Sequence, residues 1–395
     1  MILIDGFSSS YLSKKSAPFL YDVAREGFSC QIRPAFAFRG IETTIFTGLW
    51  PEKHGTWTEF SLRQNHEFDK YDGNIFLKFI RITDSIPHDR LRLALRYLIN
   101  EYFARNPFNA ASNLIPANML SHFELSQKKN IFEEKALSNA LTLFDVFREK
   151  AVPYILMSPP FIMTDKEIIR NTIQMSKNEY KYNFLFMKLS SLDPAGHEHG
   201  PNSLAIKEYV EQIDSNIELV LNNIRKVDKG VRLLVLSDHG MSRVDRSIDI
   251  LSILKELQSR INKDYVVFLD STIARFWFHN QKAKREISNV LVKINDGHIL
   301  SEEEKRNLKL PLDKKYGETI FAINEGCVIH PDFFHRLQRV NGMHGYAYTK
   351  TDEGTPMLII NKDMTQFSSH DRRPFCFTDI FPLILSSLDL DRSNR

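Results

Sequence analysis

The chain has 395 residues, of which 43% are hydrophobic and 26% are charged, proportions that are ordinary for a soluble globular protein. Its formal net charge is only +3, and its lysines and arginines are spread along the chain, which argues against binding to a nucleic-acid duplex. No apolar stretch approaches the roughly 20 residues that a membrane-spanning helix needs.

The three cysteines, Cys30, Cys327 and Cys376, show no paired spacing, and an odd number cannot all form disulfides. The chain opens on an apolar strand rather than on a charged leader with a cleavable apolar core. We therefore expect a reducing, cytoplasmic setting. Nothing in the sequence predicts an oligomeric state.

The first 60 residues predict a strand, a helix over about 17–27, a short strand, and a second helix near 40–48 that Gly48 closes. Residues 61–145 then interrupt this order and predict a helical cap insertion. Within it, apolar residues recur at helical spacing with arginines between them: Leu91, Leu95, Leu98, Tyr102 and Phe103, with Arg90, Arg92, Arg96 and Arg105. We interpret this stretch as an amphipathic helix packed on the body. A cationic membrane-surface helix is the alternative, and the sequence shows no second anchor for it.

From about residue 150 the strand and helix patterns alternate again. Apolar runs predict strands over 153–157, 184–189 and 232–236, and a long helix that begins near 204 with Ser203 as its N-cap. Residues 262–335 predict a second cap insertion with a β-rich start, followed by a strand over 357–361 and a closing helix over 377–390. The alternation predicts one α/β domain with a mostly parallel central sheet flanked by helices.

Aspartates and histidines gather where the apolar runs end. They are Asp5 after the first run, Asp193 and His197 after 184–189, Asp238 and His239 after 232–236, and His344 near two glycines. We expect a tight loop around Pro194 and Gly196 to turn Asp193 and His197 toward one point. Three aspartates and three histidines suffice for two divalent-metal sites, and this ligand set suits zinc, with manganese or magnesium as alternatives. Two such ions would clamp a phosphoryl group.

These motifs resemble the alkaline phosphatase superfamily and, within it, the type I phosphodiesterase/nucleotide pyrophosphatase group. The matching segments follow the family's order: Leu3 to Gly6, Thr47 to Gly55, Asp193 and His197 with Gly200 and Pro201, Ser237 to Met241, and Gly342 to Gly345. The resemblance implies an alkaline-phosphatase-like fold over 1–395. It also implies that one metal is held by Asp193, His197 and His344, and the other by Asp5, Asp238 and His239, while His54 is structural.

One part of the family pattern is missing. The family places a nucleophilic Thr, Ser or Cys at the start of the helix that ends in Thr47 and Gly48, where backbone N–H groups favour an oxyanion. Counting back without gaps reaches Phe38, which has no hydroxyl. Nucleotide pyrophosphatases also have an asparagine that donates to the phosphate, and Glu59 stands at that position here.

Several explanations stay open. Thr43 could be the nucleophile if the register slips, or a metal-bound hydroxide could attack directly, with Arg39 as a phosphate clamp. The chain could instead have kept its metals and lost turnover. A nucleophile could also come from elsewhere, such as the run Ser8 to Ser10, although a helix cap is the simpler interpretation of that run.

The sequence therefore predicts a metal-dependent hydrolase of small phosphate esters, most readily a phosphodiesterase or nucleotide pyrophosphatase acting on a nucleotide-like or sugar-linked substrate. A phosphomonoesterase or phosphotransferase of the same fold is one alternative. A non-catalytic protein that binds metal and a phosphate ester is another. In the second insertion, two polar runs are candidates for lining the substrate pocket, Asp270 to Thr272 and Tyr316 to Glu318. The aromatic run Phe276 to Phe278 is a candidate for stacking on a nucleobase.

Overall fold

The centre of the molecule is a six-stranded sheet with the order β2-β16-β7-β1-β6-β5. The computed structural model describes residues 1–36, 40–63, 75–103, 113–158, 164–176, 182–335, 339–367 and 374–390. Four neighbouring strands are parallel: β7 (Leu234–Ser237), β1 (Ile2–Ile4), β6 (Phe184–Leu189) and β5 (Tyr154–Met157). β16 (Met357–Ile360) is antiparallel to β7 and to the edge strand β2 (Phe28–Gln31). The predicted α/β fold with a mostly parallel sheet is confirmed.

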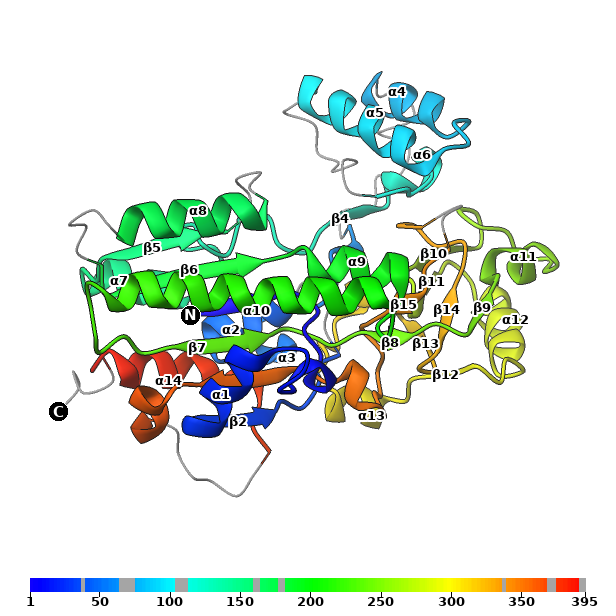
Figure 1. Cartoon of the computed structure of the whole chain (residues 1–395). Coiled ribbons are helices and arrows are strands. Elements are labelled where there is room, and N and C mark those ends of the chain that lie inside the picture. Colours follow the sequence, from blue (N-terminus) through cyan, green and yellow to red (C-terminus); the bar gives the residue numbers. More distant parts are fainter. Residues whose placement is uncertain are drawn as a thin grey trace.

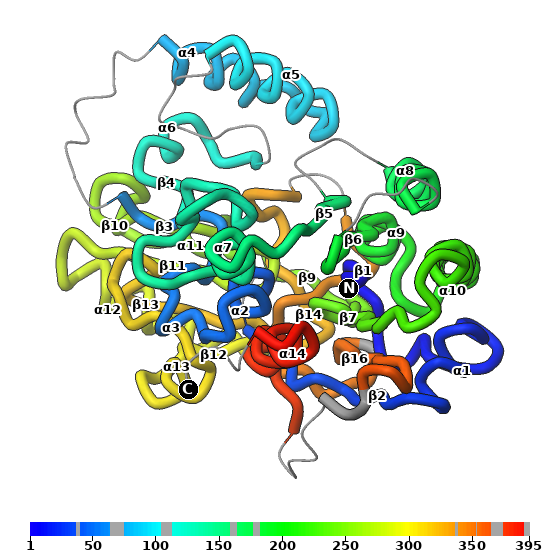
Figure 2. The backbone as a smooth tube through the Cα atoms, turned by 90° about the vertical axis from the view of Figure 1, so that its left-hand side faces the viewer, coloured from blue at the N-terminus to red at the C-terminus, as the bar shows by residue number. Residues whose placement is uncertain are grey.

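Each central strand places alternate side chains in two different apolar layers, because successive residues point to opposite faces of a sheet. Leu3 and Leu236 pack in one layer, whereas Ile4 and Val235 pack in the other. Helices cover both layers, as Figure 2 shows: α2 (Gly40–Thr47), α7 (Leu143–Glu149) and α14 (Ile380–Ser387) on one face, and α1 (Pro18–Glu26), α8 (Asp165–Ser176) and α10 (Leu204–Arg225) on the other. Ser203 caps α10 by accepting from the backbone N–H of Ile206, as predicted.

A second, antiparallel sheet with the order β10-β11-β13-β12 lies beside the main one (Figure 1). Its elements lie within the predicted second insertion: β10 (Tyr265–Leu269), β11 (Ile273–Phe278), α12 (Gln281–Leu291), β12 (Gly297–Ile299), α13 (Glu302–Asn307) and β13 (Thr319–Ile323). Its side chains form a core with α11 (Ile250–Lys255) and with the first insertion.

Shorter elements join these units. Three two-stranded pairs are β3 (Phe60–Leu62) with β4 (Phe123–Leu125), β8 (Ser242–Arg243) with β15 (Gly342–Met343), and β9 (Arg246–Ile248) with β14 (Cys327–Ile329). The short helices are α3 (Pro51–His54), α6 (Ala117–Leu120), α9 (Leu192–His199) and the 3-10 turns Ser9–Tyr11, Lys314–Tyr316, Asp352–Gly354, Lys362–Phe367 and Phe377–Asp379. No helix among the described residues is long and apolar enough to cross a membrane.

Helices α4 (Ile75–Thr83) and α5 (Asp89–Tyr102) form an antiparallel hairpin that stands above the body in Figure 1. The hairpin and α6 lie within the predicted insertion 61–145, whereas α7, which covers the central sheet, begins at Leu143. The limits 61–145 and 262–335 as domain boundaries stay predictions.

The prediction that α5 packs its apolar side on the body is wrong. The helix instead buries Arg92 and Arg96, which are 2% and 0% exposed, and turns Leu91 and Leu98 to the surface. Both arginines pair with the carboxylate of Asp84, at 2.7 Å for Arg96, and Arg96 also donates to the carbonyl oxygen of Asn113. These partners offset the cost of burying two guanidinium groups. Arg105 lies outside the described residues.

We predict that Asp84→Asn loosens the hairpin, because it leaves two buried guanidinium groups without their carboxylate. Removing one partner of a buried ion pair costs about 3–5 kcal/mol. Native-state hydrogen exchange of peptides from α4 and α5 measures the effect as lost protection. The control is Asp22→Asn, which breaks an exposed pair with Arg25 and is expected to change protection by less than about 0.5 kcal/mol. Equal protection of α5 in both variants would contradict this role of Asp84.

A second buried arginine, which lies beside an aspartate, holds the other insertion. Arg275 is fully buried, donates to the Thr58 hydroxyl and the Phe60 carbonyl oxygen, and lies 3.3 Å from the Asp270 carboxylate. Burial raises the pKa of Asp270 to about 7, with help from the negative charges of Asp332 and Glu59 and against the opposing effect of Arg275. Asp270 therefore holds its proton up to near neutral pH.

The raised pKa of Asp270 predicts a pH dependence of stability. A carboxyl whose pKa is higher in the folded than in the unfolded chain contributes stability below the unfolded pKa, and this contribution is lost as the pH rises through the folded pKa. The loss should occur between about pH 4 and about pH 7 and amount to roughly 4 kcal/mol. In urea unfolding at a series of pH values, Asp270→Asn should remove this component of the slope. An identical slope in the wild type and the variant would show that Asp270 does not titrate there.

Candidate metal centre

The six predicted ligands lie together at the carboxyl ends of the central parallel strands. Asp5 follows β1 directly, Asp238 and His239 follow β7, and α9 starts just beyond β6. Parallel strands end at one edge of the sheet, so segments far apart in the sequence converge there. Among the described residues, two groups place their ligand atoms within 4.8 Å of one another: Asp193 with His197 and His344, and Asp5 with Asp238 and His239.

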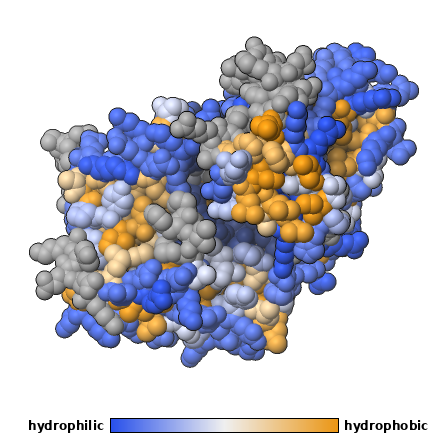
Figure 3. Space-filling view, turned by 90° about the horizontal axis from the view of Figure 1, so that it is seen from above, coloured by the Kyte–Doolittle hydropathy of each residue, from blue (hydrophilic) through white to orange (hydrophobic). Residues whose placement is uncertain are grey.

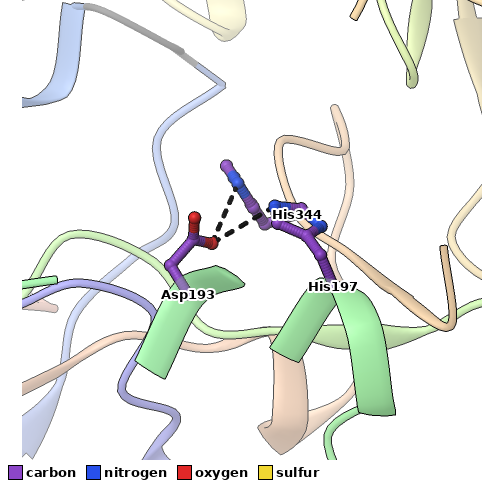
Figure 4. Close-up of side chains that lie close together, drawn as sticks. All are labelled: Asp193, His197 and His344. Carbon is purple, nitrogen blue, oxygen red and sulfur yellow. Dashed lines mark ion pairs between the residues drawn. The ribbon is translucent and has the colours of Figure 1, made fainter. Parts of the chain in front are cut away.

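Asp193 and His197 lie on a helix, so the expectation of a tight loop is wrong. They are four residues apart in α9 and therefore face the same side of it, as Figure 4 shows. Pro194 is tolerated because it lies in the first turn, where its missing N–H has no helical partner. Oδ1 of Asp193 lies 3.3 Å from Nε2 of His197 and 3.5 Å from Nε2 of His344.

Two glycines allow the His344 segment to approach α9. A Cβ at Gly196 would lie 2.7 Å from Cε of Met241, and one at Gly342 would lie 2.5 Å from the carbonyl oxygen of Gly196. Gly342 has no room for a larger residue, because its contact is with backbone, whereas the contact of Gly196 is with the end of a methionine side chain. Gly342 thus lets β15 lie against α9, and His344 lies beside Asp193.

The second group is built on the ends of β1 and β7. Nε2 of His239 lies 3.1 Å from Oδ1 of Asp5, and the carboxylate of Asp238 accepts from the backbone N–H of Gly6 at 3.2 Å. The two groups adjoin each other, since the rings of His239 and His344 stack with centroids 3.5 Å apart. Nε2 of His239 is also 4.0 Å from the Asp193 carboxylate. The arrangement is that of two neighbouring sites.

The ring orientations suit metal binding. Nδ1 of His197 lies 2.9 Å from the carbonyl oxygen of Gly342, and Nδ1 of His239 lies 2.9 Å from that of Gly240. A carbonyl oxygen only accepts, so each Nδ1 carries a hydrogen and each Nε2 faces the carboxylates. Oδ1 of Asp193 is buried without a hydrogen-bond donor, which leaves an oxygen that a cation would satisfy. Mixed nitrogen and oxygen donors of this kind fit a divalent metal.

Burial and crowding shift the pKa values of these groups. Burial and the charge of Asp5 raise the pKa of Asp238 to about 7. Burial acts against the charged form of Asp5 as well, but Lys188 and His239 outweigh it and lower the pKa to about 2. Burial disfavours the imidazolium of His239, yet Asp238 and Asp5 raise its pKa to about 10. Carboxylates that raise the pKa of a neighbouring histidine so far attract positive charge strongly, which also suits a metal ion.

Lys188 and Glu42 join the site, although the sequence patterns predicted no role for either. Nζ of Lys188 lies 3.0 Å from Oδ2 of Asp5 and 2.6 Å from Oε1 of Glu42. Burial opposes the charge of Lys188, but Glu42 and Asp5 outweigh it and raise the pKa of the ammonium group. Lys188 is the one charged residue in the apolar strand β6, and that interruption was the available signal.

A cavity of about 810 Å³ opens over both groups. Its walls include Lys188, Glu42 and Glu59, one polar segment over 127–130, and Asp270, Ser271 and His335 from the second insertion. Asp270 and Ser271 thus line this cavity, and their contact with a substrate stays a prediction. The other candidates of that insertion do not: Tyr316 is buried and donates to the carbonyl oxygen of Gly55, and Phe276 and Trp277 lie in the apolar core.

The nucleophile candidates are placed differently. Thr43 lines the cavity but is 1% exposed, and its hydroxyl donates to Oε1 of Gln127 at 3.1 Å. Ser8 caps the turn Ser9–Tyr11, which agrees with the simpler interpretation of the serine run. His54 is buried and bonded to Thr44, in keeping with a structural role. Phe38 and Arg39 lie outside the described residues, so the clamp role of Arg39 stays a prediction.

Comparison with curated proteins gives relatives of one kind. Ectonucleotide pyrophosphatase/phosphodiesterase 1 of Saccharomyces cerevisiae is 21% identical over 287 residues, which cover 67% of this chain and 37% of that protein. An uncharacterized pyrophosphatase/phosphodiesterase of Schizosaccharomyces pombe is 24% identical over 248 residues, covering 61% of this chain and 44% of that protein. The chain thus spans less than half the length of either relative.

Solved structures show the same fold. Mouse ectonucleotide pyrophosphatase/phosphodiesterase 5, in an inactive form in complex with AMP, superposes with a TM-score of 0.68 at 16% identity, covering 98% of this chain and 94% of that one. The human protein of the same name gives a TM-score of 0.67 at 16% identity, with the same coverage. Residues 1–347 match the family described as type I phosphodiesterase/nucleotide pyrophosphatase. With this match over most of its length, the chain belongs to that family.

Proposed function

We propose that this chain hydrolyses a phosphodiester or pyrophosphate bond in a small nucleotide-like or sugar-linked ester, using a centre of two zinc ions. The observation that carries the proposal is the pair of adjoining Asp/His groups on the floor of one cavity. Membership of the type I phosphodiesterase/nucleotide pyrophosphatase family supports the reaction class. The AMP bound to the mouse relative supports a nucleotide-like ligand.

The ligand assignment follows the two groups. Asp193, His197 and His344 would hold one ion, and the other would be held by Asp5, Asp238 and His239. Zinc is preferred over manganese or magnesium because half of the ligands are imidazoles, and the other two metals favour oxygen-rich shells. When bound, such ions polarise a phosphoryl group and lower the pKa of bound water.

The chain's own residues prepare the site for an anionic ester. Lys188 donates to Oδ2 of Asp5, which orients the opposite oxygen of that carboxylate toward His239. Lys128 and Lys129 line the cavity and bring positive charge toward the phosphate. Asp270, Ser271 and His335 supply acceptors and a hydroxyl on another wall, which suits the hydroxyl groups of a ribose or another sugar.

Water is the proposed nucleophile. Phe38 offers no hydroxyl, and the Thr43 hydroxyl already donates to Gln127. Because neither Phe38 nor Thr43 offers an available hydroxyl as nucleophile, a second candidate function is also favoured: a non-catalytic protein that binds metal and a phosphate ester. Hydrolysis of a phosphomonoester and phosphoryl transfer are the alternatives within the fold.

A cytoplasmic setting is also proposed, with the three free cysteines as its support.

We predict that the wild type binds two zinc ions per chain and hydrolyses bis-p-nitrophenyl phosphate faster than p-nitrophenyl phosphate. Asp193→Asn and Asp238→Asn should each lower the metal content by about one ion and the activity by about 100-fold or more, because each removes a charged ligand. Elemental analysis and the two assays measure these effects. Asp245→Asn, a change at an exposed aspartate, is the control. Stoichiometric zinc with no turnover of either ester would assign the non-catalytic function.

The role of Thr43 is tested separately. If water attacks, Thr43→Ala should keep kcat/KM for bis-p-nitrophenyl phosphate within about tenfold, since a lost hydrogen bond costs about 1 kcal/mol. Thr43→Ser, which keeps the hydroxyl, is the matched control. Loss of activity in Thr43→Ala together with normal activity in Thr43→Ser would identify Thr43 as the nucleophile and exclude direct attack by water.

A further inference from the structure

We propose that the hairpin of α4 and α5 docks on the surface of an anionic lipid bilayer. The docking surface, here called the hairpin face, consists of three residues from each helix: Ile75, Phe79 and Ile82 of α4, and Leu91, Leu98 and Tyr102 of α5. The sequence offered α5 as a cationic membrane-surface helix but no second anchor. In the structure, α4 supplies that anchor.

The hairpin face is built from one stripe on each helix. Ile75, Phe79 and Ile82 are spaced four and three residues apart, and the α5 residues are spaced seven and four apart, so each set lies along one side of its helix. Phe103, the residue after α5, links the two stripes, since its ring lies 5.7 Å from that of Phe79 and 5.0 Å from that of Tyr102, measured between centroids. Between 43% and 84% of each of the six side chains is exposed. Figure 3 shows apolar residues gathered over this part of the molecule.

The exposure follows from how the hairpin is held. The inner side of α5 is occupied by Arg92 and Arg96 with their partner Asp84. Turning α5 to bury its leucines would pull both arginines away from that carboxylate, so the apolar stripe stays outside. A contiguous exposed apolar surface on a soluble protein marks an interaction site. The hairpin also stands clear of the central sheet in Figures 1 and 2, which leaves it accessible to a flat surface.

The charges around the hairpin face select the partner. Lys78 and Arg81 of α4 are exposed, as is Arg90 of α5, which lies 4.0 Å from the Glu198 carboxylate of α9. Glu101 is the one exposed acidic residue among the described residues of the hairpin. Apolar and aromatic side chains bordered by cations are what an interfacial helix presents to anionic headgroups. A second copy of this chain is a poorer partner. A two-fold interface through the hairpin would bring equivalent cations close together, and Glu101 is the one exposed acidic residue of the described hairpin that could pair with them.

Vesicle sedimentation of the full chain tests the proposal. The probes are vesicles of phosphatidylcholine alone and of phosphatidylcholine mixed with phosphatidylglycerol. We expect binding to the mixed vesicles that weakens with salt, and little binding to phosphatidylcholine. The double variant Leu91→Ser with Leu98→Ser should bind at least about tenfold more weakly, because it removes two large apolar side chains from the contact. Lys78→Gln with Arg81→Gln should weaken binding and reduce its salt dependence.

Matched controls separate the hairpin face from general surface effects. Leu204→Ser with Val227→Ser removes two equally exposed apolar side chains from the ends of α10 and should bind like the wild type. Turnover of bis-p-nitrophenyl phosphate, a soluble substrate, should be unchanged in all these variants, so the result is independent of the proposed reaction. Absence of vesicle binding by the wild type, or wild-type binding by the leucine variant, overturns the proposal. So does a wild-type dimer in sedimentation velocity that the leucine variant converts to monomers, since the hairpin face would then belong to a second copy.

Discussion

The site depends on one electrostatic constraint, the crowding of buried carboxylates. Asp5, Asp193 and Asp238 are brought together by the ends of three neighbouring parallel strands, and their side chains are between 8% and 22% exposed. Like charges at this range in a poorly solvated place cost several kcal/mol unless cations or donors surround them. The chain itself provides such cations and donors, namely the imidazoles, Lys188 and the backbone N–H of Gly6. The same crowding supports the proposal that divalent ions bind here.

Much of the central fold and the meeting of the six Asp and His residues could be predicted from the sequence, because both follow from short-range patterns. Apolar runs mark β6 and β7, and the spacing of apolar residues marks α10. Polar residues at the ends of neighbouring parallel strands lie close together, however long the connections between those strands are. Asp5 and Asp238 could therefore be placed without knowing the intervening structure. Family motifs then divided the six ligands into two groups that the structure also shows.

Features that depend on tertiary contacts could not be predicted in this way. Pro194 and Gly196 suggest a turn, but a proline is tolerated in a first helical turn, and Gly196 lies inside α9 against the side chain of Met241. The periodicity of α5 shows that the helix has two different sides but not which side is covered, since that choice rests on Asp84 in the turn after α4. Lys188 was hidden because a single polar residue in an apolar run does not change the strand pattern.

The position of Glu42 and Lys188 has a consequence for the order of events at the site. The carboxylates of Asp5, Asp193, Asp238 and Glu42 border the same cavity as the ammonium groups of Lys128, Lys129 and Lys188. In the proposed function, two divalent ions would add positive charge next to the carboxylates and so favour an anionic ester. The ions and the ester would then bind with positive cooperativity, and by reciprocity each would stabilise the other. Release of the product anion would therefore weaken the hold of the site on its metals.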